Sequence, residues 1–389
     1  MRTISKNISN YCEKIIIGLL LSAIIAIPLF FDIRLYSVFD LSKVTALYLI
    51  TISILVVWLI LLAFRHDLKF SHIPINIPIL AYITIFVISS IISINPIMSL
   101  FGTYKRFEGL TATLCYILLF YATVNFITTT KRVYLLTISI VSCATISSIY
   151  GIIQHFGLDV FKWSSEGPRI FSTFGNPVFF SAQLVITLPL AVALFFSNSS
   201  QLKEPQITTH SKGGDEYLLK EGVFIGNRHI LWVFFILSAI IYTTFWLTNT
   251  RACFVALLGG LTPLLFFIFK KQSAERYKFV VLTISFVLIG VFFNVRHETS
   301  VIKHFAGDVR TTAASTEKLI FNKISPRKRP WIANKFSVAG SSFSRIFQYL
   351  AATRIIKDYP ALGIGPDTIG IVYQKNLAKV FSSIESDKG

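Results

Sequence analysis

Long runs of apolar residues dominate the first three quarters of the chain and predict its architecture. A helix that crosses a bilayer needs roughly 20 predominantly apolar residues, and nine segments approach this length. They are residues 15–31, 44–64, 73–93, 110–128, 133–153, 178–197, 229–248, 252–269 and 279–295. Only helices satisfy their backbone polar groups in lipid without closing a barrel. The pattern therefore predicts an all-α, polytopic membrane helix bundle with about nine spans.

A different pattern begins near residue 343. Apolar residues recur there at steps of three and four, which is typical of an amphipathic helix. They are Phe343, Ile346, Phe347, Leu350 and Ile355. Tyr359 precedes Pro360 and should be extended, so the helix is expected to end before it. The glycine-rich residues 361–366 then predict a turn at which backbone can approach a ligand closely.

Composition and charge agree with a membrane protein. The chain is 53% hydrophobic and only 14% charged, whereas a soluble globular protein holds roughly 25% charged residues. The formal net charge of +18 is best explained by anionic lipid head groups, the positive-inside bias and a phosphate-bearing substrate. No nucleic-acid module accompanies this charge, so nucleic acid is not an expected partner.

Lysine and arginine in the loops predict the orientation. With the amino terminus inside, the cytoplasmic segments hold fifteen of them and the short outer loops hold seven, as the positive-inside rule requires. The first apolar segment follows Arg2, Lys6 and Lys14 and is either a cleaved signal peptide or an uncleaved anchor; the anchor is favoured, because no clear small-x-small cleavage site ends the run. Residues 198–228 are expected to form a flexible cytoplasmic loop. An odd number of spans places residues 296–389 outside. We therefore expect a transmembrane domain over residues 1–295 and an extracytoplasmic region over 296–389.

Several residue types are expected to have structural roles. The four cysteines have no paired spacing and are interpreted as small core residues. They are Cys12, Cys115, Cys143 and Cys253. His297 and His304 are either acid/base groups or solvated side chains, and the second interpretation is favoured because they lack a partner pattern. The sequence holds no convincing nucleophile–base pair or metal cluster, so no cofactor is expected.

Arginines on the expected outer side of the membrane, next to spans or in the outer segment, are the candidates for chemistry. They are Arg106, Arg169, Arg251, Arg345 and Arg354. A charge at membrane depth is costly and usually has a partner or a function. Guanidinium groups bind phosphate oxygens bidentately, so several on one side would suit a lipid-linked diphosphate. The alternative is that each side chain simply reaches the interface from its helix. Arg251 fits this alternative least well, because it lies in a tight hairpin between two spans.

Two further features lie near these arginines. Glu108 follows Arg106 closely and is either a general base or half of a local ion pair. Asn176-Pro177 is interpreted as the start of a helix, and a structural role is favoured for it.

Four segments together resemble the O-antigen ligase family, which includes O-antigen ligases, Wzy-type polymerases and protein O-oligosaccharyltransferases. They are Arg106 to Leu110, Arg169 to Pro177, Leu247 to Ala252, and Arg345 to Pro366. They run in family order over about 260 residues. Tyr349 stands where many relatives carry tryptophan.

The resemblance implies glycosyl transfer without metal or nucleotide at the outer face of the bacterial inner membrane. The donor would be a glycan on undecaprenyl diphosphate, and the acceptor would be lipid A-core, another lipid-linked glycan or a Ser/Thr side chain. Arg251 and Arg345 match the family's two catalytic arginines. The remaining candidates, Arg106, Glu108, Arg169 and Arg354, would line the donor path. The family's histidine has no match within the 389 residues, so the sequence is interpreted as a family member truncated before it.

Two other classes stay open. A flippase or other transporter of lipid-linked oligosaccharide would carry charged or polar residues within its spans, whereas the centres of these segments are nearly uncharged. An inactive membrane scaffold is the second alternative, and truncation favours it.

Overall fold

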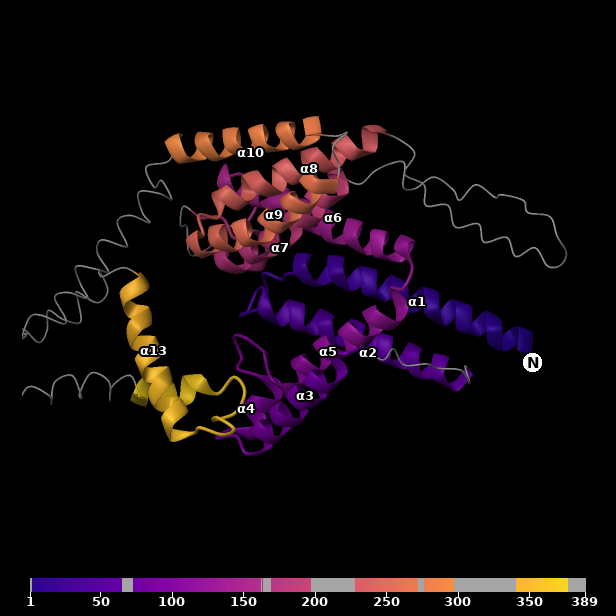
Figure 1. Cartoon of the computed structure of the whole chain (residues 1–389). Helices are drawn as coiled ribbons and strands as arrows, with labels where there is room; N and C mark the ends of the chain where they lie inside the picture. Colours follow the sequence, from indigo (N-terminus) through magenta and orange to yellow (C-terminus); the bar gives the residue numbers. More distant parts are fainter. Residues whose placement is uncertain are drawn as a thin grey trace, which may run out of the picture. The chain divides into compact units, whose positions relative to one another are not determined.

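The structure is a computed structural model that describes residues 2–64, 73–161, 163, 169–196, 228–271, 276–296 and 341–376. Over these residues the chain is all-helical, with no strand. The helices are α1 (Arg2–Leu29), α2 (Asp40–Phe64), α3 (Asn76–Ile91), α4 (Pro96–Phe101), α5 (Leu110–Phe126), α6 (Thr130–His155), η1 (Ser172–Phe174), α7 (Pro177–Phe195), α8 (Arg228–Leu247), α9 (Arg251–Lys271), α10 (Arg276–Arg296) and α13 (Ser341–Asp358) (Figure 1). Residues 369–376 form a further short helix.

The apolar segments of the sequence all fall on helices. Four described helices are long and apolar enough to cross a membrane by length and composition, namely Lys6–Leu29 of α1, α2, α6 and α7. The other five apolar helices are shorter over their described residues. Large apolar side chains such as Leu49 and Ile52 of α2 are 64% and 57% exposed. This outward-facing apolar surface is suited to lipid, because contact with water would be unfavourable.

Local sequence signals set several helix ends. Asn95 and Asn176 are N-caps whose side chains accept hydrogen bonds from Met98 N and Val178 N, and each is followed by proline at the first helical position. Asparagine at the cap and proline after it are favoured at helix starts. The predicted structural role of Asn176 is thus confirmed. Helix α4 was not expected from the sequence, because its six residues are too few for a periodic pattern.

The described residues form two compact groups, and each is considered by itself. The first group contains residues 1–16, 33–126 and the described part of 298–389. In it, Tyr48 of α2 and Thr111 of α5 share a hydrogen bond of 2.8 Å, and Tyr121 of α5 donates to Asn76 of α3 at 3.1 Å. Polar contacts of this kind join neighbouring helices in lipid.

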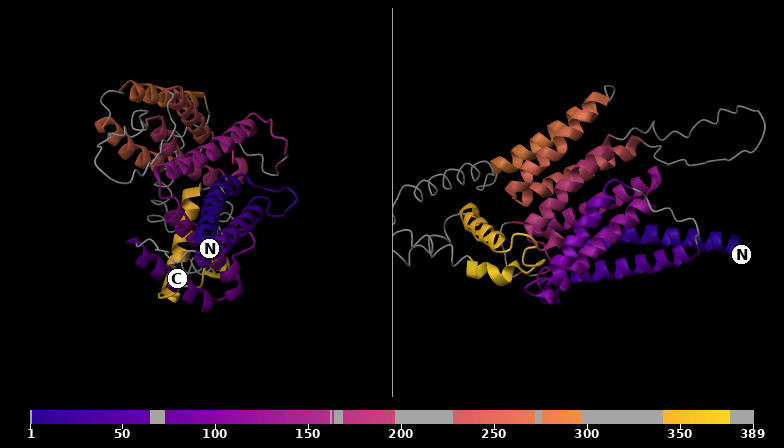
Figure 2. Two further views of the ribbon diagram at one scale, coloured as in Figure 1. Left: turned by 90° about the vertical axis from the view of Figure 1, so that its right-hand side faces the viewer. Right: turned by 60° about the horizontal axis from the view of Figure 1, so that its bottom comes forward.

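The second group contains residues 17–32 and the described part of 127–297. Its core lies where α7 packs against α6, α8 and α9, and α10 packs against α8 (Figure 2). Phe180, Phe195 and Phe245 are fully buried there. Small buried residues such as Ser148 and Thr244 lie where α6 meets α8, and small side chains let helix backbones approach closely.

Some predictions fall on residues outside the described part. They concern the cytoplasmic loop 198–228, of which only Arg228 is described, and residues 297–340 and 377–389 of the extracytoplasmic region, which include His297 and His304.

Candidate functional site

Helix α13 begins at Ser341 and ends at Asp358, immediately before Tyr359-Pro360, so the predicted helix end is confirmed. The buried face of this helix differs in part from the apolar face that the sequence predicted. Ala351 and Ile355 are buried, whereas Leu350 is 45% exposed. The half-buried Arg354 lies on the same helix. The structure describes the backbone of Arg345 but not its side chain.

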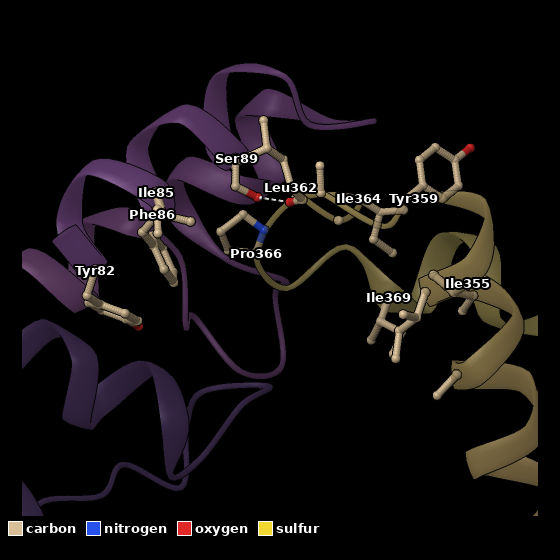
Figure 3. Close-up of a pocket in the computed structure, with 15 residues that line it drawn as sticks. Tyr82, Ile85, Phe86, Ser89, Ile355, Tyr359, Leu362, Ile364, Pro366 and Ile369 are labelled. Carbon is tan, nitrogen blue, oxygen red and sulfur yellow. Dashed lines mark hydrogen bonds between the residues drawn. The ribbon is translucent and has the colours of Figure 1, made fainter. Parts of the chain in front are cut away.

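The glycine-rich turn after α13 is docked onto α3 and α4 by serine side chains. Ser89 Oγ donates to the carbonyl of Leu362 at 2.7 Å (Figure 3). Ser93 Oγ lies 3.1 Å from the carbonyl of Ile364. Ser99 Oγ donates to the carbonyl of Pro366 at 3.0 Å. Three serine hydroxyls from residues 89–99 thus lie at the carbonyls of alternate residues of the turn, and the carbonyl of Ile364 also accepts a hydrogen bond from Ile94 N at 3.1 Å. Buried backbone carbonyls need such partners.

Gly365 is required by this docking. Its φ is +103°, and a Cβ at this position would lie 2.0 Å from Ser93 Oγ and 2.6 Å from Ser99 Oγ. Gly363 also has a positive φ, of +69°, but a Cβ there would meet nothing within 4 Å. The sequence predicted that the turn brings backbone close to a ligand. In the structure, the close approach at Gly365 is to the protein's own serines.

Asp367 joins the same turn to the loop between α4 and α5. Its carboxylate accepts a hydrogen bond from Thr103 N and another from Thr103 Oγ1, the latter at 2.8 Å. The contact links two segments that lie 264 residues apart in the chain. It therefore brings together two of the four motifs singled out in the sequence, Arg106 to Leu110 and Arg345 to Pro366.

The loop that carries Arg106 is held tightly at its base. A Cβ on Gly102 would lie 2.4 Å from Glu108 N, and a Cβ on Gly109 would lie 2.4 Å from Gly102 N, so only glycine fits at either position. The side chains of Arg106 and Glu108 are exposed on this loop. Neither prediction for Glu108, general base or local ion pair, is tested by this arrangement.

A hollow of about 480 Å³ lies between α3, α13 and the glycine-rich turn. Its walls are mostly apolar, with Phe86 from α3, Ile355 from α13 and Ile369 from the short helix beyond the turn (Figure 3). Such a lining favours a hydrocarbon portion of a ligand over a charged one.

In the second group, Arg169 is bonded to the hairpin between α8 and α9. Its Nε donates to the carbonyl of Thr248 at 2.9 Å, and an Nη donates to Thr250 Oγ1 at 2.8 Å. Thr250 Oγ1 also lies 3.4 Å from the carbonyl of Pro177 at the start of α7. The other two motifs, Arg169 to Pro177 and Leu247 to Ala252, are thereby brought together.

Two helices start at this point. Helix α7 begins at Pro177 and α9 begins at Arg251, and the two helices pack against each other. A helix amino terminus carries partial positive charge and unpaired N–H groups, which favour an anion. Arg251 occupies the first position of α9, but its side chain lies outside what the structure describes.

The loop after α6 contains a feature that sequence reasoning missed. The Asp159 carboxylate accepts hydrogen bonds from Trp163 Nε1 at 2.7 Å, Phe161 N at 3.0 Å, Tyr150 Oη at 3.0 Å and Gln154 Nε2 at 3.1 Å. Burial by itself raises the pKa of Asp159, but these hydrogen bonds to the carboxylate outweigh it, so the net pKa is lowered. We call these five residues the Asp159 clasp.

The clasp reaches the Arg169 motif through Gln154. Gln154 Oε1 accepts hydrogen bonds from Phe171 N at 3.0 Å and Ser172 N at 2.9 Å. A single carboxylate in an aromatic-rich loop is a weak signal in a sequence, which is why these residues were not identified as a unit.

Of the candidates, Arg106, Glu108, Arg345 and Arg354 lie in the first group, and Arg169 and Arg251 lie in the second. Across the described residues, no three His, Cys, Asp or Glu side chains come together as metal ligands would. Comparisons with family models, curated proteins and solved structures found no match to this chain. The function must therefore be argued from the geometry itself.

Proposed function

We propose that the chain is a membrane glycosyltransferase of the O-antigen ligase type, with nine spans and a cytoplasmic amino terminus. It would move a glycan from undecaprenyl diphosphate to lipid A-core or another glycan at the outer face of the bacterial inner membrane. The observation that carries the proposal is the bonding of Arg169 to the hairpin that ends at Arg251. It joins two arginine-bearing motifs beside the starts of two helices.

This arrangement suits a leaving group that gains negative charge. Attack at the anomeric carbon of the donor breaks its bond to the diphosphate, and the departing oxygen becomes negative. Groups that bind this developing charge lower the barrier. In the proposal Arg251 and Arg345 bind the diphosphate, while Arg106, Arg169 and Arg354 line the donor path. Glu108 is the candidate among the described residues for accepting the proton of the acceptor hydroxyl.

The apolar hollow beside the glycine-rich turn supports a donor with a hydrocarbon carrier. Its lining is apolar and its volume of about 480 Å³ exceeds that of a single isoprene unit. In the proposal, the first isoprene units of the carrier occupy this hollow. Residues 296–389 are extracytoplasmic in this arrangement.

The test is glycan transfer by variants of the protein expressed from its natural gene. We expect Arg251→Ala and Arg345→Ala each to lower the transfer rate about 10²- to 10³-fold, the loss typical of one transition-state donor. Arg132→Ala, on the proposed cytoplasmic side, is the matched control and should transfer at the wild-type rate. Near-wild-type activity in both test variants would reject the assignment.

A further inference from the structure

Two exposed tyrosines lie side by side next to the loop that carries Arg106. Tyr36, in the connection between α1 and α2, is 80% exposed, and Tyr104, in the connection between α4 and α5, is 55% exposed. Their ring centroids are 5.9 Å apart, with an angle of 35° between the ring planes. Phe107 supports Tyr104 from one edge at 5.6 Å. The rings come from segments almost 70 residues apart and together form a shallow aromatic platform.

The platform is held in place by the turn beneath it. Arg106 N and Phe107 N both donate to the carbonyl of Thr103, at 2.9 and 2.8 Å. Thr103 is in turn bonded to Asp367. Phe107 takes a φ of +56°, which is strained for a residue with a bulky side chain. A loop fixed in this way can present Tyr104 without a large entropic cost on binding.

We propose that Tyr36 and Tyr104 bind the sugar rings of a glycan. The proposal rests on the proposed function and deepens it by assigning a site to the glycan part of the substrate. The faces of an aromatic ring are electronegative, and the axial C–H groups of a pyranose carry partial positive charge. The tyrosine hydroxyls can bond the sugar hydroxyls at the edge of the same rings. Tyrosine supplies such rigid, amphipathic contact area at low entropic cost.

The charges around the platform favour a glycan over a hydrocarbon partner. Lys105, Arg106 and Glu108 are all exposed on the same loop. A lipid chain or an apolar protein segment covering the tyrosines would leave these charges poorly solvated. A polyhydroxylated ligand can bond to them, and the two cations suit a glycan attached to a diphosphate. The hydrogen bond between Thr103 and Asp367 also connects this loop to the glycine-rich turn.

The test is glycan binding by the protein in lipid nanodiscs, measured by calorimetry. The probe is the free glycan released by mild acid from the lipid-linked pool of the source cells. We expect Tyr36→Ala and Tyr104→Ala each to weaken binding about tenfold, the size of one well-packed aromatic contact. Tyr104→Phe should retain most of the affinity. Tyr11→Ala, which removes another exposed tyrosine, should bind as the wild type does.

A second measurement distinguishes the bilayer as the partner. In Tyr36→Trp, the fluorescence of the added tryptophan is measured as the difference from the wild type. The glycan should protect it from a quencher dissolved in water, and brominated lipids should leave it unchanged. Quenching by brominated lipids would place the ring in the bilayer interface, where tyrosine is also common, and would overturn the proposal. Unchanged affinity in both alanine variants would overturn it as well. Binding needs no transfer, so loss of transfer with intact glycan binding would reject only the proposed function.

Discussion

Arg169 and Thr250, 81 residues apart in the chain, are joined by a 2.8 Å hydrogen bond from guanidinium to hydroxyl. The same guanidinium donates to the carbonyl of Thr248 at 2.9 Å. Arg169 therefore fixes the hairpin that leads directly into Arg251. Its contribution to the proposed reaction would be to hold this hairpin in position as well as to supply charge.

Arg169→Lys tests this positioning role. Lysine keeps the positive charge but has no planar fork with which to bond two acceptors at fixed separation. We expect the rate of glycan transfer to fall about tenfold or more, because small displacements of a catalytic group are costly. Thr250→Ser keeps the hydroxyl and should be close to wild type, whereas Thr250→Val should resemble Arg169→Lys. Full activity in Arg169→Lys would show that charge alone suffices at this position.

The two glycines of the turn after α13 provide a matched pair. Gly365→Ala would place a methyl group against Ser93 and Ser99 and force a strained φ, so it should lower the free energy of unfolding by about 1–3 kcal/mol or more. Gly363→Ala meets no atoms and should cost only the backbone strain, about 1–2 kcal/mol. Thermal unfolding in detergent compares the two. Equal melting temperatures would contradict the close packing at Gly365.

The Thr103–Asp367 contact should stabilise the turn. Thr103→Val removes the hydroxyl donor, and Asp367→Ala removes the acceptor for both the hydroxyl and Thr103 N. We expect Thr103→Val to lower the free energy of unfolding by about 1–2 kcal/mol, since hydrogen bonds to charged groups are the stronger ones. Asp367→Ala should lower it somewhat more. Thr123→Val is the control, because the Thr123 hydroxyl bonds only within its own helix, to the carbonyl of Leu119. A control that loses as much stability as Thr103→Val would argue against the contact.

The Asp159 clasp predicts a response to acid. The pKa of Asp159 in the folded protein is below its usual value of 3.8, so the clasp adds stability above about pH 4. That contribution is lost as the pH falls through the lowered pKa of the folded state. Trp163 donates to the carboxylate, and its fluorescence should change only below about pH 4. Asp159→Asn cannot titrate and should lack this transition, while a transition that persists in Asp159→Asn would come from another group.

Local signals in the sequence predicted the helices well. Tyr359-Pro360 marked the end of α13, and Asn176-Pro177 marked the start of α7. Both signals act within a few residues, through the restricted backbone before proline and through the cap hydrogen bond. The apolar runs located the nine apolar helices found among the described residues, because length and hydropathy are also local properties.

The contacts that join the motifs could not be predicted in this way. Thr103 and Asp367 are 264 residues apart, and neither belongs to a pattern that indicates a partner. The same holds for the hydrogen bond between Arg169 and Thr250. Leu350 was expected to be buried but is exposed, because the spacing of apolar residues predicts which residues share a helix face and not whether another element covers that face.

Catalysis of glycan transfer is the central claim, and proteoliposomes test it most directly. Purified protein would be reconstituted with the lipid-linked glycan from its source cells and an acceptor, without nucleotide or added metal. We predict that the lipid-linked donor disappears and that an equal amount of free undecaprenyl diphosphate is released, with glycan gained by the acceptor. If the donor instead stays intact and only crosses to the other leaflet, the protein is a transporter and the proposed function is contradicted.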